Sequence, residues 1–122
     1  MWPEKDIEYV KLQDDAYGKH FGLFIGNCLV SVISLFTRNH MVQFRKFATL
    51  QEWQGQGYGS RLLAFILNEL EKQGVEQVWC HARTNKIKFY QKFGLKETGE
   101  RFIKDGMEYS KMSKDFHSWV KL

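Results

Sequence analysis

The sequence contains only two cysteines, a single proline and no long uninterrupted run of apolar residues. Cys28 and Cys80 are far apart and lack a CxxC partner, so we expect neither a disulfide nor a cysteine metal site. Both fall in apolar runs, which predicts reduced residues of the core. No run is long enough to cross a bilayer, and the start, MWPEKDIEYV, lacks the apolar centre of a signal peptide. These absences predict a cytoplasmic protein with no membrane partner.

The composition is typical of a folded domain with an anionic ligand. Hydrophobic residues make up 43% and charged residues 26% of the 122 residues, which predicts a single domain over 1–122. The formal net charge of +4 favours an anionic partner. Lysines and arginines are scattered among acids, however, and no recognised nucleic-acid motif accompanies them. A phosphate-bearing ligand is therefore expected, and a nucleic acid is not.

Residue patterning predicts two helices among seven strands. Apolar residues recur every three or four positions over 57–73 and again over 85–93, which predicts helices. Strands are predicted at 7–12, 20–25, 28–36, 41–50, 75–82, 95–103 and 107–116, with tight turns at 26–27 and 104–106. A strand, a helix and a strand in close succession favour a parallel pair. The expected fold class is α/β (α+β), with one mixed, mostly antiparallel sheet, a central parallel pair and helices on its faces.

A glycine-rich turn joins the strand at 41–50 to the first helix and contains Gly55, Gly57 and Gly59. The first turn of a helix has unpaired N–H groups and a partial positive charge, and glycines let an anion approach the backbone. An ordinary loop is the alternative, although turn geometry alone explains three alternate glycines poorly. The turn therefore predicts an anion site.

Two nucleotide-binding motifs do not fit this turn. A dinucleotide fingerprint needs GxGxxG and an acidic residue at the end of the next strand. Here the third glycine comes one residue early, and the next strand ends in Cys80-His81-Ala82. A Walker loop needs a lysine before its serine or threonine, and Gly59-Ser60-Arg61 has none there.

The pattern Q-x-x-G-x-G at Gln54, Gly57 and Gly59 resembles the acetyl-CoA pyrophosphate loop of the GNAT superfamily of N-acetyltransferases. A second landmark of that superfamily, F-Y-x-x-x-G-F/L, is matched by Phe89 to Leu95. The resemblance covers roughly 20–116 and looks most like a subgroup of small, poorly characterised bacterial proteins. It implies a GNAT-like fold and transfer of an acetyl group from acetyl-CoA to a primary amine by direct attack in a ternary complex.

The resemblance also implies a binding mode for acetyl-CoA. The strand at 41–50 would splay from the strand at 75–82 and leave a gap for pantetheine. Backbone groups of Phe47 and Thr49 would pair with pantetheine, and an N–H near Phe47 or Ala48 would polarise the thioester carbonyl. The predicted cofactor-binding residues are Phe47, Ala48, Thr49, Gln54, Gly55, Gln56, Gly57, Tyr58, Gly59, Ser60, Asn85 and Phe89. Arg61 and Lys92 are candidates for phosphate contact or part of a solvated basic surface, and no metal is expected.

Two side chains are candidates for proton transfer. Tyr90, at the F-Y position, is the candidate acid for the departing thiolate, because an unperturbed tyrosine has a pKa of about 10; its alternative role is core packing. His81 is the candidate base, acting through water, or else a structural hydrogen-bonding residue. Gln43 and Arg45 stand where a glutamate base would be natural, and they either line a cleft or form a solvated edge. Proton removal by ordered water, or capture of the small neutral fraction of the amine, would also satisfy the chemistry without a side-chain base.

Two departures from the family pattern bear on the acceptor. The residues before the strand at 20–25 are too few for the helices that wall the acceptor site in the family, so we expect a shortened N-terminal region. The acceptor pocket is then open, or completed by a second copy in a homodimer. Tyr109 stands where the subgroup tends to carry histidine. Aminoglycosides, polyamines, amino acids and protein amines all stay open as acceptors, and a CoA-binding module with little or no activity is the alternative function.

Overall fold

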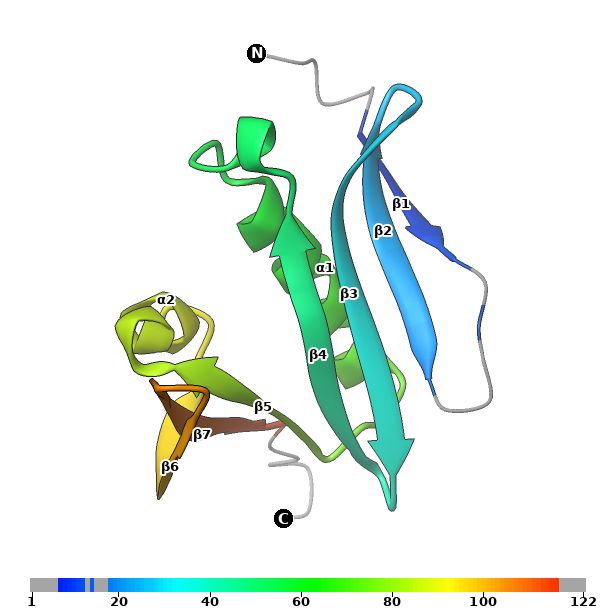
Figure 1. The fold of residues 1–122 in the computed structure, drawn as a ribbon. Coiled ribbons are helices and arrows are strands. Elements are labelled where there is room, and N and C mark those ends of the chain that lie inside the picture. The colour runs from blue at the N-terminus through cyan, green and yellow to red at the C-terminus, as the bar shows by residue number, and fades with distance from the viewer. Residues whose placement is uncertain (1–6, 13, 15–17, 117–122) are drawn as a thin grey trace.

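The computed structural model describes residues 7–12, 14 and 18–116, and these form one seven-stranded sheet with two α-helices (Figure 1). The strand order is β1-β2-β3-β4-β5-β7-β6. The strands are β1 (Ile7–Lys11), β2 (Lys19–Ile25), β3 (Cys28–Arg38), β4 (Met41–Thr49), β5 (Gln77–Arg83), β6 (Lys96–Lys104) and β7 (Met107–Asp115). Only β4 and β5 pair in parallel among the described strands. The predicted mixed, mostly antiparallel sheet with a central parallel pair is confirmed.

The helix α1 (Tyr58–Lys72) contributes the fully buried helical side chains of the core. Its buried residues follow the predicted spacing of three and four and are Tyr58, Leu62, Leu63, Ile66, Leu67 and Leu70. The second helix is shorter than the predicted 85–93, because a 3₁₀ turn, η3 (Thr84–Lys86), replaces its start and α2 covers only Ile87–Gln91. Gly94, at φ +91°, follows α2. Another 3₁₀ turn, η2 (Gln51–Trp53), follows β4.

The core lies between the helices and one face of the sheet. Buried side chains of β4 and β5, among them Phe44, Val78 and Cys80, form one cluster with the buried side chains of α1. Both cysteines are free thiols, and Cys80 is buried as predicted. The prediction that Cys28 is a core residue is wrong, since its side chain is exposed. Cys28 is the first residue of β3, directly after the turn that joins β2 to β3, and a residue at such a turn is accessible to water.

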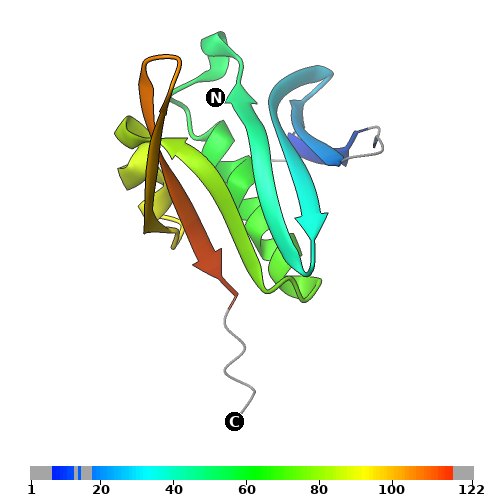
Figure 2. The ribbon, with the colours of Figure 1, turned by 60° about the horizontal axis from the view of Figure 1, so that its bottom comes forward.

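The opposite face of the sheet is covered by neither α1 nor α2. Figure 2 shows α1 behind β3, β4 and β5, with this second face toward the viewer. Because side chains alternate along a strand, Trp79 and His81 of β5 point away from the neighbouring buried Val78 and Cys80. We call this surface the open face. None of the described helices is both long enough and apolar enough to span a membrane.

Candidate active site

A cleft opens where β4 and β5 separate. The two strands pair only through Met41–Gln43 and Gln77–Trp79. Beyond these pairs lies a cavity of about 950 Å³, lined by the ends of both strands, the glycine turn, the start of α1 and residues of α2. Parallel strands that stay paired leave no such space, so the early separation of β4 from β5 creates the site.

The glycine turn forms one end of the cleft. Gly55 and Gly57 have φ angles of +78° and +88°, which side-chain-bearing residues rarely adopt. Gly59 is required for space, since a Cβ there would lie 2.9 Å from Thr49 Oγ1. The Gln54 amide Nε2 donates to the Thr49 carbonyl at 2.9 Å and ties the turn to the end of β4.

The N-terminus of α1 points into this turn without a side-chain cap. Its N-cap is Gly57, and no described side chain bonds to the free N–H groups of the first helical turn. Such N–H groups need partners, and the helix dipole favours a negative one. Together with the bare glycine backbone, the helix start can bind a phosphate group.

A β-bulge in β4 reorients the strand beside the cleft. Val32 pairs with Ala48 and Ser34 pairs with Arg45, so Lys46 and Phe47 lie opposite the single residue Ile33. Lys46 has a φ of +53°, a conformation that costs a residue with a side chain about 1–2 kcal/mol. Strain of this kind is commonly retained at functional sites. The sequence carries no glycine or asparagine here, so the bulge was not predicted.

The bulge places Phe47 on the same side of β4 as Phe44. The two rings lie 6.2 Å apart, and Phe47 also lies 6.3 Å from Phe89 of α2. Regular alternation would have put Phe44 and Phe47 on opposite faces. The resulting aromatic group forms an apolar wall of the cleft and packs against Tyr90, whose ring is 5.8 Å from Phe44.

Tyr90 is a neutral phenol within this wall. Burial, and secondarily the nearby Cys80, raise the pKa of Tyr90 above its ordinary value of 10. Burial also raises the pKa of the Cys80 thiol to about 12. At neutral pH the cleft therefore contains a hydroxyl that donates hydrogen bonds and a thiol that is not a nucleophile.

His81 borders the cleft from the open face. Its ring lies between Trp79, at 5.2 Å, and Phe102, at 4.9 Å, both in edge-on contact. Partial burial and the charge of Lys111 lower the pKa of His81 below 6.5; Arg45 and Lys104 act in the same direction, and Glu100 opposes them. His81 is therefore neutral at pH 7 and able to accept a proton.

Most of the predicted site residues surround this one cleft. Its lining includes Tyr90, His81, Phe47, Ala48, Thr49, Gln54, Gly55, Gly57, Tyr58, Gly59, Ser60 and Phe89. Tyr58 is only 3% exposed, and its ring packs 5.7 Å from that of Trp53. The cleft lining does not include Gln56, Asn85, Arg61 or Lys92. The exposed Gln56 side chain instead donates to the Glu52 carbonyl at 3.4 Å.

Several lining residues were not among the predicted site residues. They are Phe44, Arg45, Lys46, Trp53, Cys80, Ala82, Arg83, Lys86 and Tyr109. For Gln43 and Arg45 the alternation along β4 left two possibilities, a cleft or a solvated edge. Arg45 lines the cleft, and Gln43 does not. Arg83 is the last residue of β5, and Lys86 ends the 3₁₀ turn that follows it. Their only signal in the sequence was two basic residues after the strand predicted at 75–82. Within the described ranges, no group of three or more potential metal ligands occurs.

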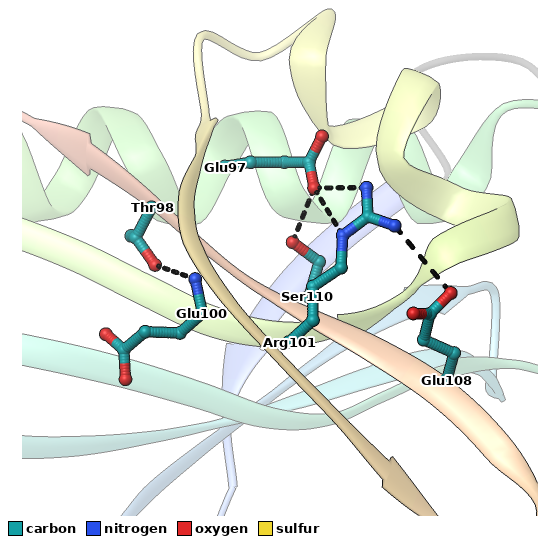
Figure 3. A network of polar contacts seen from close by, with 6 residues as sticks. All are labelled: Glu97, Thr98, Glu100, Arg101, Glu108 and Ser110. Atoms are coloured by element: carbon teal, nitrogen blue, oxygen red, sulfur yellow. Dashed lines mark hydrogen bonds and ion pairs between the residues drawn. The ribbon is translucent and has the colours of Figure 1, made fainter.

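A polar network stabilises the β6–β7 hairpin on the face of the sheet that carries the helices (Figure 3). The pairing shifts between Glu97 and Arg101, so residues 98–100 form an irregular segment. Glu97 Oε1 accepts hydrogen bonds from Ser110 Oγ at 2.8 Å and from Arg101 Nη2 at 2.8 Å. Arg101 also lies 3.7 Å from Glu108. The network closes the irregular segment at both ends and so holds the hairpin that carries Tyr109.

This network predicts an acid-sensitive hairpin. The Ser110 hydroxyl and Arg101 hold the pKa of Glu97 below its ordinary value, so the carboxylate stabilises the fold above the unfolded-state pKa of about 4.3. That contribution is lost as pH falls through the lower folded-state pKa. Glu97→Gln should lower the melting temperature at pH 7 and flatten its decline in acid, whereas Glu108→Gln should change it little. Equal melting curves for wild type and Glu97→Gln would contradict this role.

Sequence comparisons identify the family of the chain. Residues 5–116 match the acetyltransferase (GNAT) domain family. The uncharacterized N-acetyltransferase YitI of Bacillus subtilis is 36% identical over 109 residues, which cover 82% of this chain and 73% of YitI. An uncharacterized acetyltransferase of Streptococcus pyogenes serotype M6, M6_Spy1295, is 24% identical over 62% of this chain. The matched part spans only 52% of that streptococcal protein.

Solved structures share the fold. A Bacillus subtilis acetyltransferase in complex with CoA superposes with a TM-score of 0.76 at 15% identity, over 89% of this chain and 98% of that protein. A GNAT family acetyltransferase of Elizabethkingia anophelis with acetyl-CoA bound gives 0.77 at 12% identity, over 92% and 99% of the two chains. The sheet, the cleft and these similarities agree: the chain belongs to the GNAT family of N-acetyltransferases.

Proposed function

We propose that the protein transfers the acetyl group of acetyl-CoA to a primary amine by direct attack in a ternary complex. The observation that carries this proposal is the cleft between β4 and β5, which has an uncapped helix start at one end and Tyr90 and His81 in its lining. The uncapped helix start suits a pyrophosphate, and the two side chains suit proton transfer. A cytoplasmic location and a homodimer stay predictions from the sequence.

In this proposal the glycine turn binds the pyrophosphate of acetyl-CoA. Backbone N–H groups from Gly57 to Ser60 donate to the phosphate oxygens, and the dipole of α1 adds about 0.3–1 kcal/mol. The pantetheine arm enters the gap along β4, where β5 no longer pairs with it. The backbone beside the bulge at Lys46 then presents N–H groups near Phe47 to the thioester oxygen.

Acetyl transfer requires a neutral amine and a stabilised leaving group. His81 takes the proton from the acceptor ammonium or from the attacking nitrogen, directly or through water. The amine nitrogen bonds to the thioester carbon, the negative oxygen accepts backbone hydrogen bonds, and the carbon–sulfur bond then breaks. Tyr90 gives its proton to the departing sulfur, so that CoA leaves as the thiol. The proton held by His81 then passes to solvent, and Tyr90 takes a proton back from solvent. The products are an N-acetyl amine and CoA.

The state of Cys80 supports direct attack over an acetyl-enzyme intermediate. Of the two cysteines, Cys80 alone lines the cleft, and burial raises its pKa to about 12. The thiolate is the nucleophilic form of cysteine, so Cys80 is inert at neutral pH. Intact-protein mass spectrometry after incubation with acetyl-CoA alone should show no acetylated Cys80.

Two measurements test the proposed function. Calorimetry should detect binding of acetyl-CoA, and a thiol-release assay with a panel of primary amines should detect amine-dependent formation of CoA. Binding without amine-dependent release would support the alternative function, a CoA-binding module with little or no activity. Absence of binding would reject both.

Replacing Gly57 with alanine should weaken CoA binding about tenfold. The left-handed conformation costs alanine about 1–2 kcal/mol, and relaxation of that strain would rotate the N–H groups at the start of α1. Gly74→Ala is a matched control, because Gly74 has a φ of +81°, faces open space as Gly57 does, and lies at the other end of α1. Calorimetry should show weaker binding for Gly57→Ala only; equal affinities for both variants would contradict the placement of the pyrophosphate.

A further inference from the structure

Three side chains of the open face form a row across β4, β5 and β7. His81 pairs directly with Lys111 of β7. The parallel register that aligns Gln43 with Trp79 places Arg45 level with His81 on the far side of the gap. The candidate base thus stands between two cations.

The position of Arg45 along β4 separates it from the phosphate end of the cleft. The glycine turn follows Thr49. Arg45 and Thr49 pair with Ser34 and Ser31 of β3, three residues apart, or roughly 10 Å at the rise of a strand. Phe47, where we place the thioester, lies between Arg45 and Thr49. Arg45 is therefore beyond the acetyl group as seen from the pyrophosphate, on the side from which an acceptor approaches.

The charges that line the cleft have one sign. Arg45, Lys46, Arg83 and Lys86 line it, and its lining includes no aspartate or glutamate. Glu100, the acid that acts on His81, forms an ion pair with Lys111 at 3.6 Å. The Arg45 guanidinium lies 5.5 Å from the centre of the Phe36 ring, and among the described residues no carboxylate is ion-paired with it.

We propose that the acceptor is a primary amine that carries a carboxylate, and that Arg45 binds this carboxylate while the amine faces His81. The proposal rests on the proposed acetyl transfer. A guanidinium suits a carboxylate because it offers two parallel N–H donors, and the cation–π contact with Phe36 limits where the guanidinium can lie. Polyamines and aminoglycosides bring several positive charges into a cleft that offers them no counter-charge, so they are disfavoured.

Matched amines separate the charge of the acceptor from its size. Three amines with similar carbon chains are titrated into the CoA-saturated protein. Their chains end in a carboxylate (5-aminopentanoate), a methyl group (pentylamine) or a second ammonium group (1,5-diaminopentane). Amino acids paired with their decarboxylated amines extend the comparison to α-carboxylates. We expect each carboxylated amine to bind about 10- to 100-fold more tightly than its partner, the range for a hydrogen-bonded charge. The diamine should bind most weakly.

Arg45→Gln should remove this preference and leave the affinity for pentylamine unchanged. Arg38→Gln, which changes an arginine at the end of β3 outside the cleft lining, should keep the preference. Three results would overturn the assignment of the acceptor. They are equal affinities for a carboxylated amine and its matched amine, a higher affinity for the diamine, and an equal loss of affinity for both members of a pair in Arg45→Gln.

Thiol release from acetyl-CoA, measured with the same amines, separates this inference from the proposed function. Arg45-dependent binding without thiol release would uphold the carboxylate assignment and reject acetyl transfer. Fast release with diamines in preference to carboxylated amines would uphold acetyl transfer and reject the assignment. If CoA does not bind, the same amines are titrated into the protein alone. An Arg45-dependent preference for carboxylated amines would still uphold the carboxylate assignment, and its absence would reject it.

Discussion

Replacement of Tyr90 by phenylalanine should lower kcat by about 10²- to 10⁴-fold, the contribution of a positioned proton donor. An ordinary tyrosine, with a pKa of about 10, is already protonated at neutral pH, and burial raises the pKa of Tyr90 further, so its hydroxyl is in the proton-donating form across the neutral range. Phenylalanine keeps the ring that packs against Phe44 and Phe89 and removes only the hydroxyl. The fold and the affinity for acetyl-CoA should therefore change little.

The measurement is thiol release at saturating acetyl-CoA, with calorimetry of cofactor binding on the same samples. Tyr9→Phe is the matched control, since Tyr9 lies on the edge strand β1 and stacks on Phe65 outside the cleft. A Tyr90→Phe protein with wild-type turnover would show that Tyr90 only packs. A parallel loss of cofactor affinity and turnover would point to a damaged cleft.

Replacement of His81 by glutamine should lower kcat/KM by about 10²- to 10³-fold and change the shape of the pH profile. The base acts in its neutral form, and its surroundings lower the pKa of His81 below 6.5. Wild-type activity should therefore contain an acidic limb that rises with pH and has its midpoint below 6.5. Above that limb, the ionisation of the acceptor amine adds its own rise.

The test is the pH dependence of kcat/KM for both proteins with one acceptor. His81→Gln should lose the acidic limb and keep the rise due to the amine. His40→Asn serves as the control, because His40 lies in the β3–β4 turn at φ +66°, which asparagine tolerates. If the acidic limb persists in His81→Gln, the limb belongs to another group. Ordered water would then be the better candidate for proton removal.

Local patterns in the sequence account for the elements of the fold. The spacing of Leu62, Leu63, Ile66 and Leu70 predicts α1, because a helix that packs on a sheet buries one stripe of side chains. The alternate glycines predict the turn before it, since Gly55 and Gly57 have φ angles that other residues adopt at a cost. The predicted start of the second helix was less accurate, because a 3₁₀ turn replaces the first residues that were predicted to be helical.

The bulge and the cleft depend on contacts between segments that are distant in the chain. Lys46 adopts a left-handed conformation without any local signal, because the shift of β3 against β4 imposes it. The separation of β4 from β5 follows from how each strand pairs with its other neighbour, which periodicity does not encode. For the same reason the sequence left Arg45 as either a cleft residue or a solvated edge.

The sequence by itself determined the order of the elements, the glycine turn and the identity of the candidate residues Tyr90 and His81, because these depend on nearest neighbours and on short motifs. Only the tertiary structure decided that Tyr90 lies in the aromatic wall on the helix side of the cleft and that His81 stands between Arg45 and Lys111 on the open face. Burial and neighbouring charge set the pKa of each group, and both arise from packing between elements.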